Sequence, residues 1–296
     1  MITYSYTFVN MQGEGHYTGV PSAWIRLFGC SLQCEGFGQK DPTDPSSYHL
    51  PYKDADISDV KSVKDLPVFE TGCDSSYSWS ARYKHLMNRK EAPEVVEEIR
   101  DQMKSRFNPD GKFQSRHMCF TGGEPLLKPN QKACKEILEE FIHQDDIPPS
   151  ITFETNGIQK VNEELFETLE KYKSMGGEVF MSISPKLFHV SGEKEKKAIK
   201  EESIQNLIQC SDNYQLKFVL ADTDEAWDYF DALLDRFDKS MMMPGFDYDK
   251  VWVMPVGATD ESQYNIARTI ADRTLERGLK VAARVHSYIY GNEPAT

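Results

Sequence analysis

The stretch that decides the fold runs from Ser22 to Cys34 and reads SAWIRLFGCSLQC. Its first eight residues form a short, mostly apolar run, and a pair of cysteines follows at once. Six similar runs recur along the chain, at 117–121, 150–155, 178–184, 214–220, 250–255 and 279–284. Short runs of this kind are typical of buried parallel strands.

Segments with helical spacing lie between these runs. One spans 93–107, where Pro93 stands near the start and Val95, Val96, Ile99 and Met103 recur at helical intervals. Further helices are predicted at 131–143, 162–173, 195–210, 224–238 and 260–277. Alternating strands and helices predict an α/β fold of parallel βα units. Six or seven units suit an incomplete TIM-type barrel, whose chemistry lies at the carboxyl ends of its strands.

Composition narrows the class of protein. The chain has 296 residues, 39% hydrophobic and 27% charged, which suits one domain over residues 1–296 with a sizeable core. No apolar run approaches the roughly 20 residues that span a membrane. The first residues lack the features of a signal peptide, so we expect a cytosolic protein. A net charge of −13 argues against nucleic acid as a partner and favours a small-molecule substrate.

Residues 35–72 break the regular pattern. They contain seven glycines and prolines with scattered acidic residues and little periodicity. We interpret this segment as an insertion or a long ordered loop.

Three of the six cysteines are candidates for a metal site. Cys30 and Cys34 are separated by three residues, and Cys73 follows after 38 more. In a cytosolic chain such thiols are reduced, and three of them can hold three irons of a [4Fe–4S] cluster with the fourth iron open. A chance pairing and a zinc site remain alternatives. Cys119, Cys134 and Cys210 fall inside predicted strands or helices and are expected to be structural.

Polar motifs follow several of the predicted strands. They are TGGEP at 121–125, ETNG at 154–157, SPK at 184–186 and MPVG at 254–257. The two glycines of the first would allow a ligand to approach the backbone, and Glu124 could receive an amine. Each motif alone is more often a turn, but several on one rim predict a site.

These motifs together resemble the radical S-adenosylmethionine (SAM) superfamily. Its cluster loop has the spacing C-x3-C-x2-C, but Phe37 stands where this chain would place the third cysteine. We interpret Cys73 as that cysteine, displaced by the insertion 35–72. The segment 73–79, CDSSYSW, is similar to the C-D-T-x-Y-x-W of 7-carboxy-7-deazaguanine synthases.

The two ends of the chain support the narrower resemblance. The segments 8–15 (FVNMQGEG) and 17–21 (YTGVP), followed by Arg26 and Gly29-Cys30, resemble the opening of that family. Its closing segment resembles residues 284–289. The family's C-terminus reaches the substrate, but the tail 291–296 (GNEPAT) is longer here, so that role is not transferred. The resemblance covers nearly the whole chain outside 35–72.

The resemblance implies roles for individual residues. Cys30, Cys34 and Cys73 would hold the [4Fe–4S] cluster. Ser75 stands where the family has a threonine that binds Mg²⁺, although it could instead cap a turn. Gly72 stands where the family often has an aromatic residue beside the adenine. SAM would be contacted by Gly72, Cys73, Asp74, Gly122, Gly123, Glu124, Ser184, Pro185, Lys186 and Pro255.

Five residues are candidates for binding the substrate: Gln12, Glu14, Arg26, Thr121 and His286. Glu14 can accept from the amino and ring N–H groups of a pterin, and Gln12 can both donate and accept. The two-pronged donor face of Arg26 suits a carboxylate. The structural alternatives are an ion pair for Arg26 and a satisfied core position for His286.

The resemblance implies an enzyme that contracts the ring of 6-carboxy-5,6,7,8-tetrahydropterin to 7-carboxy-7-deazaguanine with loss of ammonia. It also implies a one-electron reductase, such as a flavodoxin or ferredoxin, and a homodimer. Two other functions remain open. One is an activase that makes a glycyl radical on a partner enzyme, against which the QGEG motif and His286 argue. The other is a non-enzymatic scaffold whose cysteines bind zinc.

Overall fold

A single mixed sheet forms the frame of the molecule. The computed structural model describes residues 1–113 and 116–291. Its nine strands lie in the order β3-β1-β2-β4-β5-β6-β7-β8-β9. The strands are β1 (Ile2–Met11), β2 (Pro21–Leu27), β3 (Asn88–Lys90), β4 (His117–Gly122), β5 (Ser150–Thr155), β6 (Glu178–Ile183), β7 (Asn213–Leu220), β8 (Val251–Pro255) and β9 (Lys280–Val281). From β2 to β9 every neighbouring pair is parallel, which confirms an α/β fold with a mostly parallel sheet.

The sequence did not predict β1 or β3. Strand β1 pairs antiparallel with both β2 and β3. The sheet is therefore mixed, whereas the sequence predicted parallel strands only. All but two of the ten residues of β1 are buried, although several carry hydroxyl groups. Because β1 runs against β2, the loop 12–20 that joins them lies beside the amino end of β2.

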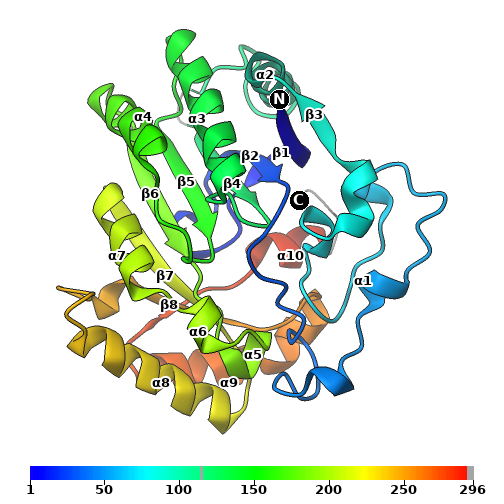
Figure 1. Cartoon of the computed structure of the whole chain (residues 1–296), viewed down its shortest axis with the longest axis vertical. Helices are drawn as coiled ribbons and strands as arrows, with labels where there is room; N and C mark the ends of the chain where they lie inside the picture. Colours follow the sequence, from blue (N-terminus) through cyan, green and yellow to red (C-terminus); the bar gives the residue numbers. More distant parts are fainter. Residues whose placement is uncertain (114–115, 292–296) are drawn as a thin grey trace.

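Helices connect the strands. They are α1 (Pro51–Asp54), α2 (Ala92–Arg106), α3 (Lys128–His143), α4 (Glu163–Ser174), α5 (Phe188–Ser191), α6 (Glu195–Ala198), α7 (Glu201–Cys210), α8 (Asp224–Lys239), α9 (Asp260–Glu276) and α10 (Val285–Tyr290). Short 3₁₀ helices occupy 15–17, 45–47, 63–65, 76–78, 81–86 and 248–250. The helix predicted at 195–210 is divided into α6 and α7. In Figure 1, α4, α7 and α8 lie on the left and α1 with its loops lies on the right.

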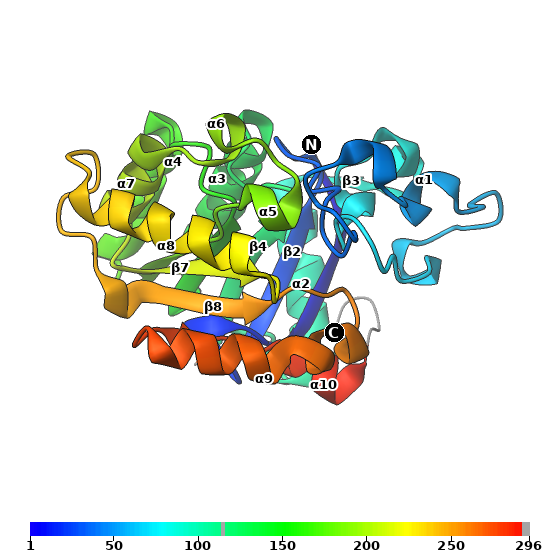
Figure 2. The ribbon, with the colours of Figure 1, turned by 90° about the horizontal axis from the view of Figure 1, so that it is seen from below.

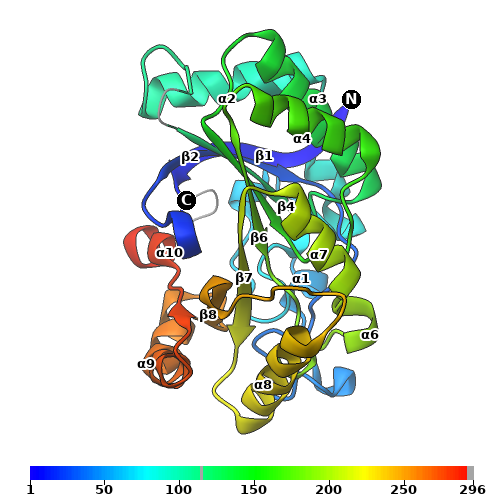
Figure 3. The ribbon, with the colours of Figure 1, turned by 90° about the vertical axis from the view of Figure 1, so that its left-hand side faces the viewer.

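The two faces of the sheet differ in chemistry because side chains alternate along each strand. In β7, Leu216, Phe218 and Leu220 are buried in the main hydrophobic core. The intervening Lys217 and Val219 line a cavity on the opposite face. Figure 3 shows the sheet bent, with α3, α4, α7 and α8 on one side and α10 on the other. The side away from the main helices therefore carries the polar residues.

The insertion 35–72 forms a small structure of its own beside β1 and β2. Its Tyr52, Val63, Leu66 and Phe69 pack with Trp24 and neighbouring residues into a second hydrophobic cluster. Figure 2 shows this part of the chain projecting to one side of the sheet. Within 35–72 the described chain forms only short helices, which is why hydrophobic periodicity did not reveal this packing. That residues 1–296 form one domain with an insertion at 35–72 stays a prediction.

No helix within residues 1–113 and 116–291 combines the length and the apolar character that crossing a membrane requires.

Candidate active site

A cavity of about 280 Å³ opens on the polar face of the sheet. This volume lies near the lower end of the range for small-molecule sites. The five substrate candidates and the three candidate cluster ligands all line it: Gln12, Glu14, Arg26, Cys30, Cys34, Cys73, Thr121 and His286. The fold therefore gathers residues from both ends of the chain into one space.

Most of the residues predicted to contact SAM line the same cavity. They are Gly72, Cys73, Asp74, Gly122, Gly123, Ser184, Lys186 and Pro255, and Ser75 lies with them. Glu124 and Pro185 are not among the lining residues. Residues 292–296 of the tail lie outside the described part of the chain.

The backbone of the first cysteine loop is held by an acidic side chain. Glu193 Oε1 accepts from the backbone N–H of Gln33 at 2.6 Å and of Cys34 at 2.9 Å. Cys34 has a φ of +52°, in the left-handed region that costs a residue with a side chain roughly 1–2 kcal/mol. Such a conformation persists only where the surroundings enforce it, and it is frequent at functional sites.

Cys73 returns to this loop because the insertion closes on itself. The Gly72 N–H donates to the carbonyl oxygen of Phe37 at 2.8 Å. Phe37, near the start of the insertion, and Gly72, at its end, are thus adjacent, although 34 residues lie between them. This hydrogen bond places Cys73 next to the position where the usual spacing has the third cysteine.

The three thiols form one buried group. Burial raises the pKa of Cys30 to about 12 and raises the pKa of Cys73 as well. Burial also raises the pKa of Cys34 well above its usual value, Lys186 opposes that rise, and the neighbouring Cys73 and Cys30 add to it. Each thiol would therefore resist ionisation until a cation binds beside it.

The chemistry of these thiols fits an iron–sulfur cluster. Within the described residues, no group of three or more His, Cys, Asp or Glu side chains is arranged to hold one metal ion. Soft thiolates are the ligands of iron–sulfur clusters, and three cysteines line one end of the cavity.

The glycine pair after β4 brings two loops into contact. A Cβ atom on Gly123 would lie 2.3 Å from the carbonyl oxygen of Gly29, beside Cys30. A Cβ atom on Gly122, whose φ is +146°, would meet the Leu27 carbonyl oxygen at 2.2 Å. Only glycine allows this approach. The pair therefore fixes the cysteine loop against β4, besides lining the cavity.

Glu124 is committed to the protein itself. Its carboxylate accepts from Thr155 Oγ1 at 2.7 Å, from the Asn156 N–H at 2.8 Å and from the Leu126 N–H at 3.0 Å. Burial raises its pKa, and these hydrogen bonds oppose the rise. Glu124 joins the loops after β4 and β5, and its predicted contact with SAM stays a prediction.

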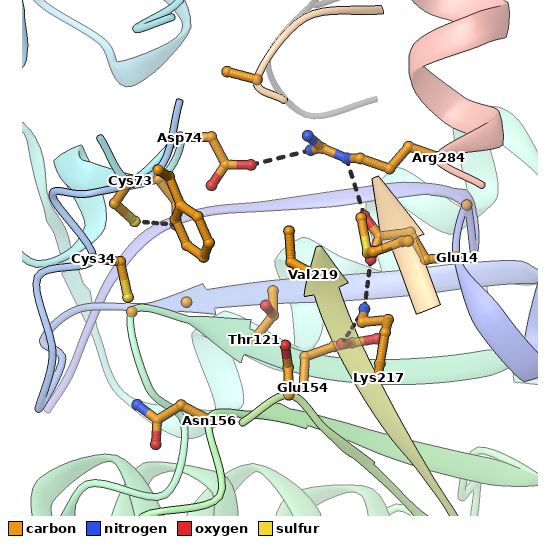
Figure 4. Close-up of a pocket in the computed structure, with 18 of the residues that line it drawn as sticks. Glu14, Cys34, Cys73, Asp74, Thr121, Glu154, Asn156, Lys217, Val219 and Arg284 are labelled. Atoms are coloured by element: carbon orange, nitrogen blue, oxygen red, sulfur yellow. Dashed lines mark hydrogen bonds and ion pairs between the residues drawn. The ribbon is translucent and has the colours of Figure 1, made fainter. Parts of the chain in front are cut away.

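A row of opposite charges occupies the other end of the cavity (Figure 4). Lys217 Nζ lies 2.5 Å from Glu14 Oε2 and 3.2 Å from Glu154 Oε2. Arg284 Nε lies 3.1 Å from Glu14 Oε1, and its Nη2 lies 3.2 Å from Asp74 Oδ2. The row thus runs from β5 through β7 and the loop after β1 to the residue that follows Cys73.

Glu14 and Lys217 hold each other ionised. Burial alone would raise the pKa of Glu14, but Lys217 and Arg284 outweigh it and lower that pKa well below its usual range. Burial alone would lower the pKa of Lys217, but Glu14 and Glu154 outweigh it and raise that pKa. Buried charges of this kind are tolerated because each has an opposite partner.

Arg26 is held by hydrogen bonds and by aromatic rings. Its Nε donates to Tyr6 Oη at 3.2 Å, its Nη1 donates to the Gly122 carbonyl oxygen at 3.4 Å, and its Cζ lies 5.8 Å and 6.0 Å from the ring centres of Tyr6 and Tyr77. No carboxylate of the described residues lies within 4.0 Å of it, so a structural ion pair does not explain it. An arginine held by aromatic rings over a cavity can bind a carboxylate with both prongs.

His286 lies at the start of α10 against the loop after β1. A Cβ atom on Gly13 would lie 1.9 Å from its Nδ1, so glycine is required there. Burial lowers the pKa of His286; Glu14 opposes this change, and Arg284 and Lys217 add to it. The imidazole is therefore neutral near pH 7 and can donate and accept.

Several residues of the cavity received no role from the sequence, among them Glu154, Asn156, Lys217 and Arg284. Glu154 and Asn156 lie in the motif ETNG, and Arg284 lies in the closing segment. Lys217 stands between apolar neighbours in the run YQLKFVL. A single charge on the alternate face of a buried strand is the sequence feature that would have identified it.

Several known proteins resemble this chain over almost its whole length. A 7-carboxy-7-deazaguanine synthase from Pyrobaculum aerophilum is 22% identical, covering 96% of this chain and 93% of that protein. Proteins with the same name from Rhodopirellula baltica and Thermoplasma acidophilum are 23% and 22% identical, covering 99% and 97% of this chain and 88% and 96% of theirs. The resemblance to the 7-carboxy-7-deazaguanine synthases that the sequence motifs indicated, and with it the prediction of an enzyme of this type, is confirmed.

Two other comparisons add less. No family model matches the chain. The crystal structure of QueE from Escherichia coli is 17% identical and superposes with a TM-score of 0.48, covering 96% of this chain and 94% of that one.

Proposed function

We propose that this chain converts 6-carboxy-5,6,7,8-tetrahydropterin to 7-carboxy-7-deazaguanine with loss of ammonia, a carbon–nitrogen lyase reaction. The observation that carries the proposal is the shared cavity. Three cysteines from distant parts of the sequence meet at one end of it, and the family's substrate residues line the rest.

Cys30, Cys34 and Cys73 would hold a [4Fe–4S] cluster, and the glycine turn at 122–123 with Ser184 and Lys186 would border SAM. When bound, the cluster and SAM would supply the one-electron chemistry that removes a hydrogen atom from the substrate. The protein's own task is to position the substrate and keep water from the site.

The charged end of the cavity suits the polar edge of a pterin. Glu14 is fixed by Lys217 and Arg284, so its remaining lone pairs can accept from the amino and ring N–H groups. Gln12 is also oriented, because its Oε1 accepts from the Glu14 N–H at 3.1 Å and its Nε2 donates to Glu154 at 3.1 Å. Arg26 would bind the substrate carboxylate.

Ser75 would bind Mg²⁺. Its hydroxyl group makes no capping hydrogen bond to the 3₁₀ helix 76–78 that it precedes, which supports a role other than that of a turn cap. Its Oγ lies 3.5 Å from Cys73 Sγ, and Asp74 offers a carboxylate beside it. Hard oxygen donors next to the substrate cavity suit Mg²⁺, which keeps several of its waters.

The remaining expectations are also proposals. The sheet would be an incomplete TIM-type barrel in a single domain. The enzyme would act in the cytosol as a homodimer with a one-electron reductase, and without nucleic acid or membrane.

Reconstitution without oxygen tests the function. The chain should take up about four irons and turn brown. With SAM, dithionite and the pterin, mass spectrometry should detect 7-carboxy-7-deazaguanine and 5′-deoxyadenosine. A cluster-loaded chain that cleaves SAM but yields no deazaguanine would exclude the proposed substrate. A colourless, zinc-containing chain would exclude the radical chemistry altogether.

A further inference from the structure

A break in the register of β1 brings Tyr6 beside Arg26. Tyr4 is opposite Leu27, but Tyr6 is opposite Arg26, and the register shifts between these two pairs. Without the shift the residue opposite Tyr6 would be Ile25, which is buried in the main core. The one extra residue in β1 therefore turns Tyr6 to the face of the sheet that carries Arg26. Bulges of this kind occur often beside active sites, where they re-aim a side chain.

The side chain of Tyr6 is fixed by its neighbours on that face. It is buried in the second hydrophobic cluster, where its ring centre lies 5.5 Å from that of Phe8. Its Oη lies 3.0 Å from the Oη of Tyr77, and either hydroxyl group can be the donor. Tyr77 belongs to the 3₁₀ helix 76–78, which follows Cys73 closely. The oxygen that accepts from Arg26 is therefore held from two sides.

The hydroxyl group of Tyr6 has no other use among the described residues. A buried hydroxyl without a partner destabilises an apolar cluster, so a residue that only filled this space would be phenylalanine. The partners of the Tyr6 hydroxyl are Arg26 and Tyr77. The polar atom is thus explained by the arginine that it contacts.

The contacts of Arg26 leave one edge of its guanidinium free. A guanidinium has N–H donors on each of its nitrogens. Nε donates to Tyr6 and Nη1 to the Gly122 carbonyl oxygen, while Nη2 has no hydrogen-bond partner within residues 1–113 and 116–291. Because Arg26 lines the cavity, the edge formed by its terminal nitrogens can receive both oxygens of a carboxylate.

We propose that Tyr6 and Tyr77 are positioning residues that aim Arg26 at the substrate carboxylate and thereby select a pterin that carries one. This inference rests on the proposed function, in which Arg26 binds that carboxylate. Neither tyrosine lines the cavity, so neither would touch the substrate itself. Their contribution is to hold a long, flexible side chain in one orientation before the ligand arrives, which lowers the entropy lost on binding.

The test compares two ligands that differ in the carboxylate. The probes are 6-carboxypterin, a stable oxidised relative of the substrate, and pterin, which lacks the carboxylate. Calorimetry measures their binding to the cluster-loaded protein with SAM, with the cluster kept oxidised so that no turnover occurs. The variant Tyr6→Phe removes the hydroxyl group and keeps the ring. Tyr83→Phe is the matched control, because Tyr83 is buried in the same cluster but its hydroxyl donates to the Tyr52 carbonyl oxygen.

Wild type should prefer 6-carboxypterin to pterin. Tyr6→Phe should bind 6-carboxypterin roughly tenfold more weakly and pterin as wild type does, because only the first ligand needs the oriented guanidinium. Tyr77→Phe should act in the same direction by roughly threefold, and it tests the pair even if Tyr6→Phe does not fold. Tyr83→Phe should keep the wild-type preference.

A double-mutant cycle separates positioning from a general effect on the fold. Arg26→Met should abolish the preference for 6-carboxypterin. Adding Tyr6→Phe to Arg26→Met should change the preference no further, since the tyrosine acts only through the arginine. A further loss of preference in the double variant would show that Tyr6 acts by another route.

The failures can be told apart. If Tyr6→Phe weakens both pterins equally, or neither, the inference is wrong while the proposed function stands. A wild type that forms deazaguanine but binds both pterins equally would also overturn the inference alone. If wild type binds neither pterin and forms no deazaguanine, the proposed function is wrong and the inference falls with it.

Discussion

The two ends of the cavity are built differently. The sulfur end is made of loops, and burial raises the pKa of each of its three thiols. The charged end is made mainly of strand residues and their neighbours, and its Glu14 and Lys217 already hold each other ionised. The charged end is complete in the protein alone, whereas the sulfur end reaches its ionised form only with a bound cation.

This difference shows which end of the cavity must be rigid in the protein alone. A substrate edge of fixed hydrogen-bonding pattern needs donors and acceptors that do not move, and strands provide them. A cluster brings its own geometry, so loops suffice if their backbone is tied at a few points. We therefore expect substitutions at one end to leave the other end largely unchanged.

The largest effect should follow Cys73→Ala. The cluster would lose one of three ligands, so iron content and visible absorbance should collapse and SAM cleavage should fall to background. Cys134→Ala is the control, because Cys134 is a buried cysteine that does not line the cavity. Full iron content in Cys73→Ala would show that the insertion does not deliver the third ligand.

The next effect should follow Lys217→Met. Glu154 would lose its cation and Glu14 would keep only Arg284, and breaking a buried ion pair costs about 3–5 kcal/mol of folding stability. Denaturant unfolding should show this loss, and the pterin should bind more weakly, while iron content stays near wild type. Adding Glu154→Gln removes one uncompensated charge and should restore part of the stability. A loss of iron equal to that of Cys73→Ala would contradict the independence of the two ends.

A smaller effect should follow Glu193→Ala. The backbone N–H groups of Gln33 and Cys34 would lose their shared acceptor, and hydrogen bonds to a charged group contribute about 1.5–3 kcal/mol. The cluster should still assemble but should lose iron to a chelator several times faster than wild type. Glu193→Gln keeps an acceptor oxygen and should behave nearly as wild type. Equal rates of iron loss in all three proteins would show that the loop needs no such support.

The smallest effect concerns the titration of His286. Its lowered pKa means that it gains a proton only below the ordinary value of about 6.5. Lys217→Met removes a cation that disfavours the imidazolium, so the pKa should rise. Proton NMR of the imidazole would measure the shift. His117, whose pKa burial lowers to about 4, contacts none of these charges and should not change. An unchanged His286 would show that the charged row does not reach it.

Most of the fold was predictable from the sequence. Strands β2 and β4 to β9 were expected within a few residues, because buried parallel strands are short apolar runs. Strand β1 was missed because several of its buried residues carry hydroxyl groups and its antiparallel pairing leaves no βα signature. The division of 195–210 was also missed, since the apolar spacing continues across the break between α6 and α7.

The site was predictable in part. Motifs identified many of the residues that line the cavity. Glu124 instead accepts a hydrogen bond from the loop after β5, and Pro185 is not among the lining residues. The partners of Glu14 were not predictable, because Lys217 and Arg284 belong to segments more than 200 residues away.

The sequence alone determined the local structure and the chemical kinds of group available, because hydrophobic period and turn residues act over a few positions. Only the tertiary structure decided which groups meet. Cys73 joins Cys30 and Cys34 because Gly72 is bonded to Phe37, and Lys217 joins Glu14 across 203 residues because β7 lies where the loop after β1 ends. Such meetings depend on strand order and loop closure, which no local pattern of side chains encodes.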